Sequence, residues 1–469
     1  METMSALDSA FLEIEDRHVS LHIGSVGVFE GPAPPFAAVR DEIERKLPLV
    51  PRYRQRMERV PGNLGRPAWR DDPDFDLDYH LRRTALPEPG GDIQLQDLVG
   101  RVMSQPLDHD RPLWEDWVVE GLSGGRWALV TKVHHSMVDG IAGTDLLTTF
   151  FGSAPEAAER TSVEPAGGSL PRPLERRRRD LVINALREAA AGVPATARAA
   201  TVALSHPRST VTSATSSSVG LLRYLGAARP VSRSSLIGPL GAARRYRWAE
   251  VPLRDVLDVR AAYDCTVNDV VLAAVTLAFQ ELLLGRGESL SAHAIRTLVP
   301  VSVRRPDQRG AFDNRVSAIL LDLPFDETDP LVVLDVVSER MKRLKSSHEA
   351  EAGELVTSLG NSIPPAGLAA GLKLAFRVPQ RFLTTVTTNV PGPREELHLC
   401  GLRMVKAYPY VPIADRVRTG IAVTSYDGTL QFGITADWDS TPDIDVLRDG
   451  LVEACTDLTR RAHEKRGKP

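Results

Sequence analysis

A change of composition in the middle of the chain constrains its fold more than any other feature. From residue 153 to about residue 235 the sequence is rich in Ala, Ser, Pro and Arg, and it contains the basic run Arg176–Arg179. The stretches on either side alternate strand and helix patterns. A chain of 469 residues is also too long for one ordinary hydrophobic core. The sequence therefore predicts an N-terminal domain at 1–152, a partly helical crossover at 153–235 and a C-terminal domain at 236–469.

Hydrophobic periodicity predicts strands and helices in both domains. The capping residue Thr266, with Asp269 three positions later, marks the start of a long helix, and Asp427-Gly428 predicts a tight hairpin. This pattern favours an α/β class with mixed sheets (α+β). The predicted strands are 21–29, 127–134, 294–303, 317–323, 384–389, 419–425 and 429–436, and the predicted helices are 37–47, 140–150, 266–284 and 443–458.

Bulk composition excludes several classes of protein. The net charge of -4 gives no field that would attract nucleic acid. Three distant cysteines, Cys265, Cys400 and Cys455, argue against zinc and against a disulfide framework. The N-terminus lacks the features of a signal peptide, and no run of eighteen apolar residues predicts a membrane span. We therefore expect a cytoplasmic protein that meets any lipid substrate from the membrane surface.

The segment Lys132–Gly140 (KVHHSMVDG) carries the most chemical information. Adjacent histidines at the end of an apolar strand point to opposite sides if the strand persists, so one can be buried while the other faces a cavity. A neutral imidazole can accept a hydroxyl proton and return it to a leaving group. Gly140 permits an unusual backbone conformation or a close approach of substrate.

Other chemistries fit the segment less well. The His134-His135 pair with Asp139 could supply metal ligands, although only Asp108-His109-Asp110 offers further ligands elsewhere, and weakly. The G-x-S-x-G pattern of serine hydrolases is missing, as are the glycine-rich patterns that bind nucleotide phosphates.

The segment resembles the HHxxxDG signature of the CoA-dependent acyltransferase superfamily, which includes chloramphenicol acetyltransferases, carnitine acyltransferases and peptide-synthetase condensation domains. Eight further blocks resemble the bacterial wax ester synthase/diacylglycerol acyltransferase family. They occur in the family's order and run almost from end to end of the chain. These blocks are residues 5–12 (SALDSAFL), 22–24 (HIG), 106–108 (PLD), 111–115 (RPLWE), 267–273 (VNDVVLA), 300–304 (PVSVR), 389–393 (NVPGP) and 425–428 (SYDG).

The resemblance implies two chloramphenicol-acetyltransferase-like domains with the active site in a tunnel between them. His135 would act as general base on the acceptor hydroxyl, which attacks the acyl-CoA thioester without an acyl-enzyme intermediate. His134 would be structural rather than chemical, Asp139 would pair with Arg304, and Asn268 would donate to the oxyanion or cap its helix. Acyl-CoA is a co-substrate in this scheme, and neither a cofactor nor a metal is expected.

The implied products are triacylglycerol, wax esters, or both. Two alternatives are a peptide-synthetase-type condensation enzyme and a non-catalytic lipid-coat protein. The chain departs from the family at Ile237, where Asn is usual, and at Asp313, where Gly is common. The sequence leaves open the choice between diacylglycerol and long-chain alcohol, the acyl length and whether the chain forms a homodimer. Docking on a membrane or lipid droplet is expected because the acceptors barely leave a bilayer.

Overall fold

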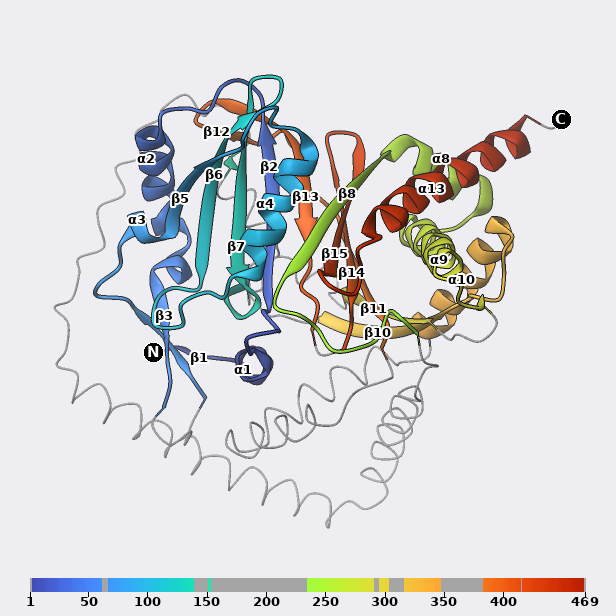
Figure 1. The fold of residues 1–469 in the computed structure, drawn as a ribbon, viewed down its shortest axis with the longest axis horizontal. Coiled ribbons are helices and arrows are strands. Elements are labelled where there is room, and N and C mark those ends of the chain that lie inside the picture. Colours follow the sequence, from blue (N-terminus) through green and yellow to red (C-terminus); the bar gives the residue numbers. More distant parts are fainter. Residues whose placement is uncertain are drawn as a thin grey trace, which may run out of the picture.

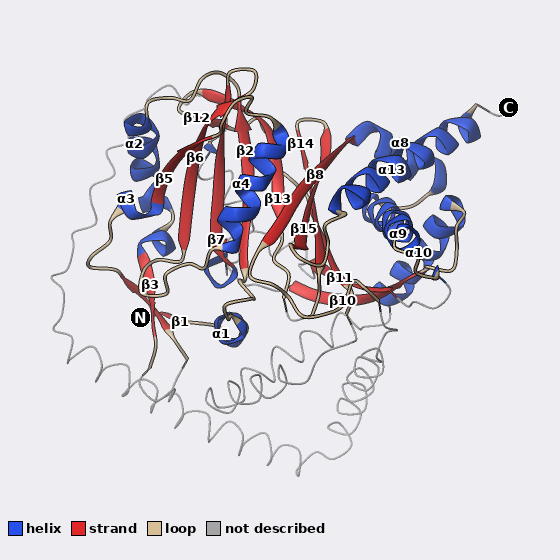
Figure 2. Cartoon of the chain, in the orientation of Figure 1, coloured by secondary structure: helices blue, strands red, loops and turns tan. Residues whose placement is uncertain are grey.

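Two six-stranded mixed sheets form the body of the protein in a computed structural model (Figures 1 and 2). The structure describes residues 2–60, 66–138, 151–152, 234–290, 295–302, 316–346, 383–414 and 416–467. The predicted class of mixed α/β sheets is confirmed. The predicted helix at 140–150 and almost all of the predicted crossover lie outside the described residues.

The first sheet has the order β12-β13-β2-β7-β6-β5. All neighbours in it are antiparallel except β5 and β6, which are parallel. The predicted strands at 21–29 and 127–134 are confirmed to within one residue as β2 and β7. Its strands are β2 (His22–Phe29), β5 (Leu81–Ala85), β6 (Trp114–Leu122), β7 (Arg126–His134), β12 (His398–Leu399) and β13 (Leu402–Tyr410).

Shorter elements surround this sheet at the N-terminal end of the chain. A three-stranded sheet has the order β1-β4-β3. The elements are β1 (Glu2–Thr3), β3 (Gln55–Glu58), β4 (Ala68–Asp71), α1 (Ala6–Ile14), α2 (Phe36–Lys46), α3 (Leu77–His80), α4 (Asp92–Ser104) and the 3₁₀ helices η1 (Leu47–Leu49), η2 (Pro51–Arg54) and η4 (His135–Val138).

The second sheet has the order β10-β9-β11-β14-β15-β8. Strand β11 is parallel to both of its neighbours, and the other pairs are antiparallel. The hairpin predicted at Asp427-Gly428 joins β14 to β15, and both residues have positive φ, 46° and 69°. Its strands are β8 (Arg244–Pro252), β9 (Ile295–Ser302), β10 (Val316–Leu323), β11 (Thr385–Val390), β14 (Thr419–Tyr426) and β15 (Thr429–Asp437).

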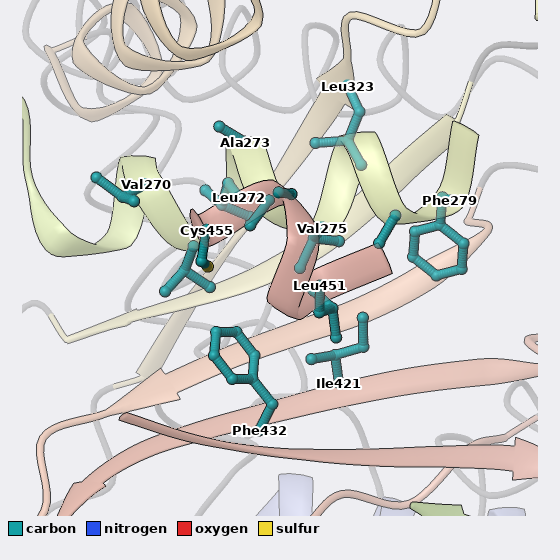
Figure 3. Packing of buried hydrophobic residues seen from close by; sticks show 14 of the residues in the cluster. Val270, Leu272, Ala273, Val275, Phe279, Leu323, Ile421, Phe432, Leu451 and Cys455 are labelled. Carbon is teal, nitrogen blue, oxygen red and sulfur yellow. The ribbon is translucent and has the colours of Figure 1, made fainter. Parts of the chain in front are cut away.

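Four helices pack beside the second sheet, and α9 lies at the centre of its core. They are α8 (Leu253–Tyr263), α9 (Val267–Gly285), α10 (Pro330–Ser346) and α13 (Ile444–Arg466). Figure 3 shows Val275 and Phe279 of α9 among side chains of α13 and the sheet. As predicted, Thr266 caps α9: its hydroxyl accepts from the Asp269 amide at 3.2 Å, and the Asp269 carboxylate accepts from the Thr266 amide at 2.9 Å.

Helix α9 is the one described helix that is long and apolar enough to cross a membrane. In the structure 72% of the most apolar 18-residue stretch of this helix is buried inside the protein. It packs against α13, α10 and the second sheet. Its place in the core therefore accounts for its apolar composition.

The C-terminal half of the chain contributes strands to both sheets, which the predicted domain limits did not anticipate. After β11 the chain crosses to the first sheet, forms β12 and β13 there, and returns to the second sheet as β14. Strand β13 pairs with β2 from Gly24↔Tyr410 to Phe29↔Met404. The predicted C-terminal domain at 236–469 therefore supplies two strands to the sheet of the predicted N-terminal domain at 1–152.

The seam between the sheets is close and partly aromatic. Trp248 of β8 stacks on Tyr408 of β13 with ring centroids 4.1 Å apart and planes 8° from parallel. The Tyr246 hydroxyl donates to the Pro409 carbonyl at 2.7 Å. Gly433 of β15 approaches so closely that an added Cβ would lie 1.7 Å from the same carbonyl oxygen. The seam therefore depends on a residue without a side chain at position 433.

We expect Gly433→Ala to lower the free energy of unfolding by about 1–3 kcal/mol, the usual cost of overpacking. Gly285→Ala at the end of α9 is the matched control, because nothing lies within 4 Å of its added Cβ. That variant should be neutral or more stable, since Ala favours helix. Chemical unfolding of both variants checks this, and equal stabilities would contradict the close approach.

Candidate active site

Strand β7 ends at His134, and η4 begins at His135. The strand therefore does not continue through both histidines, contrary to the condition under which they were expected to point to opposite sides. The turn into η4 still gives the two rings different surroundings. His134 is fully buried, whereas His135 is half-buried.

The His134 ring is fixed at both nitrogens. Its Nδ1 accepts the Ser136 amide at 3.1 Å and lies 2.6 Å from the Ser136 hydroxyl, which is also fully buried. A backbone amide can only donate, so Nδ1 carries no proton and the proton of the neutral ring is on Nε2. That Nε2 lies 3.3 Å from the Glu15 carboxylate.

Glu15 follows the last residue of α1 and brings three histidines together. Its Oε2 lies 2.9 Å from Nε2 of His109, and its Oε1 lies 3.3 Å from His134 and 3.7 Å from His22. His22 and His134 are direct cross-strand neighbours in β2 and β7, so their side chains share one face of the sheet. The amide of Leu21 donates to the same Oε1 at 2.7 Å.

These partners decide the charge state of the cluster. Burial by itself would raise the pKa of Glu15, but the His109 hydrogen bond and the adjacent imidazoles outweigh it and hold the pKa well below its usual range. Burial, followed by the nearby Lys132 charge, moves the pKa of His22 well below its ordinary value. At neutral pH the cluster therefore contains an ionised carboxylate and a neutral His22.

Lys132 lies on the same strand face as His134 and supplies a compensating positive charge. Its ammonium group donates to the carbonyls of Val102 at 3.1 Å and Gln105 at 2.5 Å, at the end of α4. Burial lowers the pKa of Lys132 to about 8, against the opposing effect of Glu115 and Glu15. Lys132 thus remains mostly charged at pH 7 and also holds the end of α4.

His135 is held from two directions. Its amide donates to the Leu21 carbonyl at 2.9 Å, and its ring lies 4.5 Å from the ring of Phe11 in α1. The Leu21 side chain packs with Leu240 and Ile413 from the C-terminal half. The turn that carries His135 therefore lies beside the junction of the two halves.

Asn268 is in the first turn of α9, one residue after its N-terminus. The Asn389 side-chain amide donates to the Asn268 side-chain oxygen at 3.5 Å. Because the amide hydrogens of Asn268 are not used in this contact, they are available to another acceptor. The capping role belongs to Thr266, so helix capping does not explain Asn268.

The segments 389–393 and 425–428 also meet in the structure. An added Cβ on Gly392 would lie 1.8 Å from the Ser425 carbonyl oxygen, so only glycine fits there. The Tyr426 hydroxyl accepts from the Leu397 amide at 2.9 Å and donates to the Met404 carbonyl at 3.0 Å. The 389–393 turn thus packs closely on the end of β14, and Tyr426 next to it ties β14 to β13.

Comparison with known proteins identifies the chain. The family models "Wax ester synthase/diacylglycerol acyltransferase catalytic domain" and "WS/DGAT C-terminal domain" match residues 4–271 and 312–459. A Mycobacterium tuberculosis protein named probable diacylglycerol O-acyltransferase tgs1 is 38% identical over 481 aligned positions, covering 100% of this chain and 99% of that protein. The chain belongs to the wax ester synthase/diacylglycerol acyltransferase family. It is therefore an acyltransferase, as the resemblance predicted.

Solved structures support the fold of this wax ester synthase/diacylglycerol acyltransferase family member. The wax ester synthase/diacylglycerol acyltransferase from Marinobacter aquaeolei VT8 superposes with a TM-score of 0.70 at 24% identity, covering 99% of this chain and 100% of that one. The first condensation domain of the calcium-dependent antibiotic synthetase gives a TM-score of 0.57 at 16% identity, covering 97% and 95%. The chain thus shares its fold with condensation domains, but the family models place it in the wax ester synthase/diacylglycerol acyltransferase family.

Several predicted site residues of this acyltransferase are not described by the structure. Asp139 and Gly140 follow the described part of η4, and Arg304 lies beyond the described part of β9. The Asp139–Arg304 pair and the role of Gly140 therefore stay predictions. Of the two departures from the family, Asp313 also lies outside the described residues. Ile237 is half-buried and forms an isolated bridge with Val417.

Sequence reasoning missed Glu15 and the roles of His22 and His109. His109 was considered only as a weak metal ligand, and Glu15 stands among other charged residues at the end of a short helix. Within the described ranges, no group of three or more His, Cys, Asp or Glu side chains is arranged to hold a metal ion. The imidazoles of His22, His109 and His134 instead lie within 3.7 Å of the Glu15 carboxylate. Leu113 and Trp114 of the block at 111–115 are fully buried in the core.

The different surroundings of the two histidines in this acyltransferase predict different stabilities. We expect His134→Ala to lower the free energy of unfolding by about 2–4 kcal/mol, because it leaves a cavity and strands the Ser136 and Glu15 groups. His135→Ala should cost about 1 kcal/mol or less, since its ring is half-buried. Denaturant titrations of both variants provide the measurement, and a similar loss in both would contradict the assignment of His134 as structural.

Proposed function

We propose that this acyltransferase transfers the acyl group of acyl-CoA to the hydroxyl of diacylglycerol, a long-chain alcohol or both, with His135 as general base. The observation that carries this proposal is the contrast between the paired histidines. His134 is fully buried and has polar neighbours at both ring nitrogens, whereas His135 is only half-buried. A neutral imidazole that is not fully enclosed can accept the proton of an alcohol and return it to a leaving group.

The reaction follows from the chemistry of the groups. His135 takes the proton of the acceptor hydroxyl as its oxygen attacks the thioester carbonyl, and a tetrahedral oxyanion forms. Collapse of this intermediate breaks the carbon–sulfur bond and releases CoA thiolate, which receives the proton from His135. No acyl-enzyme and no cofactor are needed. The amide hydrogens of Asn268, which its contact with Asn389 does not use, support its proposed role as donor to the oxyanion.

Replacing His135 tests the proposal directly. We expect His135→Ala to lower the rate of CoA release about 100- to 10,000-fold, the usual contribution of general base catalysis. His463→Ala is the control, because that histidine on α13 is exposed and its ring lies 3.2 Å from Asp258. CoA release at the parent rate from a folded His135→Ala protein would refute the assignment.

The acceptor class is tested with the parent protein. CoA release should follow addition of acyl-CoA with diacylglycerol or with a long-chain alcohol, and not with an aminoacyl carrier protein. Relative rates with the two lipids give the preference that the sequence leaves open. A rate with the carrier protein equal to that with the lipids would favour the condensation alternative, and no CoA release with any acceptor would favour the lipid-coat alternative.

We further propose that the protein docks on membranes or lipid droplets through Arg176–Arg179. The acceptors barely leave a bilayer, and α9 is a core helix rather than a span. Residues 171–204 combine this basic run with an apolar helical pattern, as interfacial helices do. They lie outside the described residues, so the proposal rests on the sequence.

Replacing Arg176–Arg179 with Ser should weaken binding to anionic vesicles at low salt, by up to about 1 kcal/mol for each arginine. Activity on a detergent-dispersed acceptor should stay at the parent value. Arg460→Ser with Arg466→Ser is a control, since both arginines on α13 already pair with acidic side chains. Vesicle co-sedimentation at low and high salt is the measurement. Equal binding of the variant and the parent at low salt would move the docking surface elsewhere.

A further inference from the structure

The carboxylate of Glu15 is connected to His135 in two ways, by a close electrostatic contact with the His134 ring and by hydrogen bonds through the peptide groups of Leu21. We infer that Glu15 is a positioning residue, which fixes the tautomer of His134 and the backbone at His135 so that the His135 ring faces the acceptor. This inference rests on the proposed function of His135 as general base. Glu15 itself touches neither the reacting atoms nor His135 in this account.

The first connection runs through the His134 ring. Because Nδ1 of His134 accepts the Ser136 amide, the proton is on Nε2, and Glu15 Oε1 lies 3.3 Å from that nitrogen in a close electrostatic contact whose angle is outside hydrogen-bond geometry. The other tautomer would place a proton against the Ser136 amide and a lone pair against the carboxylate. Glu15 therefore favours the one tautomer that lets the chain turn sharply from His134 to Ser136, on either side of His135.

The second connection runs through the peptide groups of Leu21. Its amide donates to Glu15 Oε1 at 2.7 Å, and its carbonyl accepts the His135 amide at 2.9 Å. The same carboxylate oxygen thus holds both the strand segment that binds the His135 backbone and the ring that precedes His135. A single negative charge at this place orders both neighbours of the proposed base.

Helix α1 adds a third constraint that begins at the same residue. Glu15 is the C-terminal capping position of α1, and Phe11, one turn earlier, contacts the His135 ring. Anchoring Glu15 at His109 and Leu21 therefore also fixes the helix that carries Phe11. The position of the His135 ring is set by backbone and aromatic contacts that all depend on the placement of residue 15.

The substitution that separates charge from size is Glu15→Gln. The side-chain NH2 group of glutamine would face at least one of the groups that now donate to the carboxylate. Both tautomers of His134 and more than one conformation of the η4 turn should then be populated. We expect kcat to fall about 10- to 100-fold, as when a partner that orients a functional histidine is lost. KM for acyl-CoA should stay unchanged, because Glu15 does not contact the thioester substrate in this account.

The tautomer gives a readout that a general loss of stability would not move. In the parent protein labelled with nitrogen-15 at its 11 histidines, long-range proton–nitrogen correlation spectra should show His134 as the Nε2–H form. Its signals can be assigned from the spectrum of a His134→Gln variant. Glu15→Gln should show a mixture or the Nδ1–H form.

Glu13→Gln is the matched control on the same helix. Glu13 pairs with Arg59 at 2.8 Å, away from the histidines. This variant removes one acidic charge from α1 and should keep the parent kcat and the parent His134 tautomer. A similar loss of kcat in both variants would mean that Glu15 acts only through the net charge of the helix.

Three results would overturn the inference. They are an Nδ1–H tautomer of His134 in the parent protein, a parent kcat in Glu15→Gln, or stoichiometric zinc in the purified protein, which would make the imidazoles ligands instead of donors. The spectrum of the parent protein decides the first point even if Glu15→Gln does not fold. Failure of the proposed function looks different, because His135→Ala would then keep its activity whatever happens at Glu15.

Discussion

Strand β2 joins the two halves of the protein and also sets the position of the proposed base. One edge of β2 pairs with β7, so that His22 lies opposite His134, and the other pairs with β13, which belongs to the C-terminal half of the chain. The residue before β2, Leu21, binds the His135 backbone and packs against Leu240 and Ile413. A shift of β2 by one residue would turn its side chains to the opposite face and separate these contacts. Assembly of the two sheets and placement of His135 therefore depend on one strand register.

A buried carboxylate is costly unless donors and positive charge surround it. Glu15 meets that requirement with the Leu21 amide, the imidazoles of His109 and His134, and the nearby Lys132 charge. An apolar residue at this place would leave the Leu21 amide without this acceptor and the Nε2 of His134 without a negative charge beside it. The polar cluster therefore specifies the geometry of the turn to η4, while the aromatic seam around Trp248 and Tyr408 holds the sheets together.

The sequence predicted the parts of the fold that have strong local signals. The alternating apolar run of β7, the Thr266 cap with Asp269 and the Asp427-Gly428 hairpin each depend on neighbouring residues alone. Strand β13 was missed because Arg403, Lys406 and Pro409 interrupt its apolar pattern. Its partner β2 is also more than 370 positions earlier in the chain, and no local pattern records such a pairing.

The same limit applies to the site. The histidine motif identified His134 and His135, but Glu15 meets His109 and His134 only after the chain has folded, across 94 and more positions. The contact between Asn389 and Asn268 spans 121 positions. The order of the motifs indicated that the blocks at 267–273 and 389–393 belong to one family pattern, but it did not show that these two segments touch. The family could thus be read from the sequence, whereas the contacts around His134 and His135 required the structure.

The central proposal is that His135, oriented by the His134 ring and by the Leu21 backbone, removes the proton of the acceptor hydroxyl. A crystal structure with a non-reactive acyl-CoA analogue and a long-chain alcohol or diacylglycerol tests it most directly. If His135 is the base, the acceptor hydroxyl should lie within about 2.6–3.2 Å of a His135 ring nitrogen, the range needed for proton transfer. An acceptor hydroxyl bound to a different basic group, with His135 out of direct reach and not connected to it by a water molecule, would contradict it.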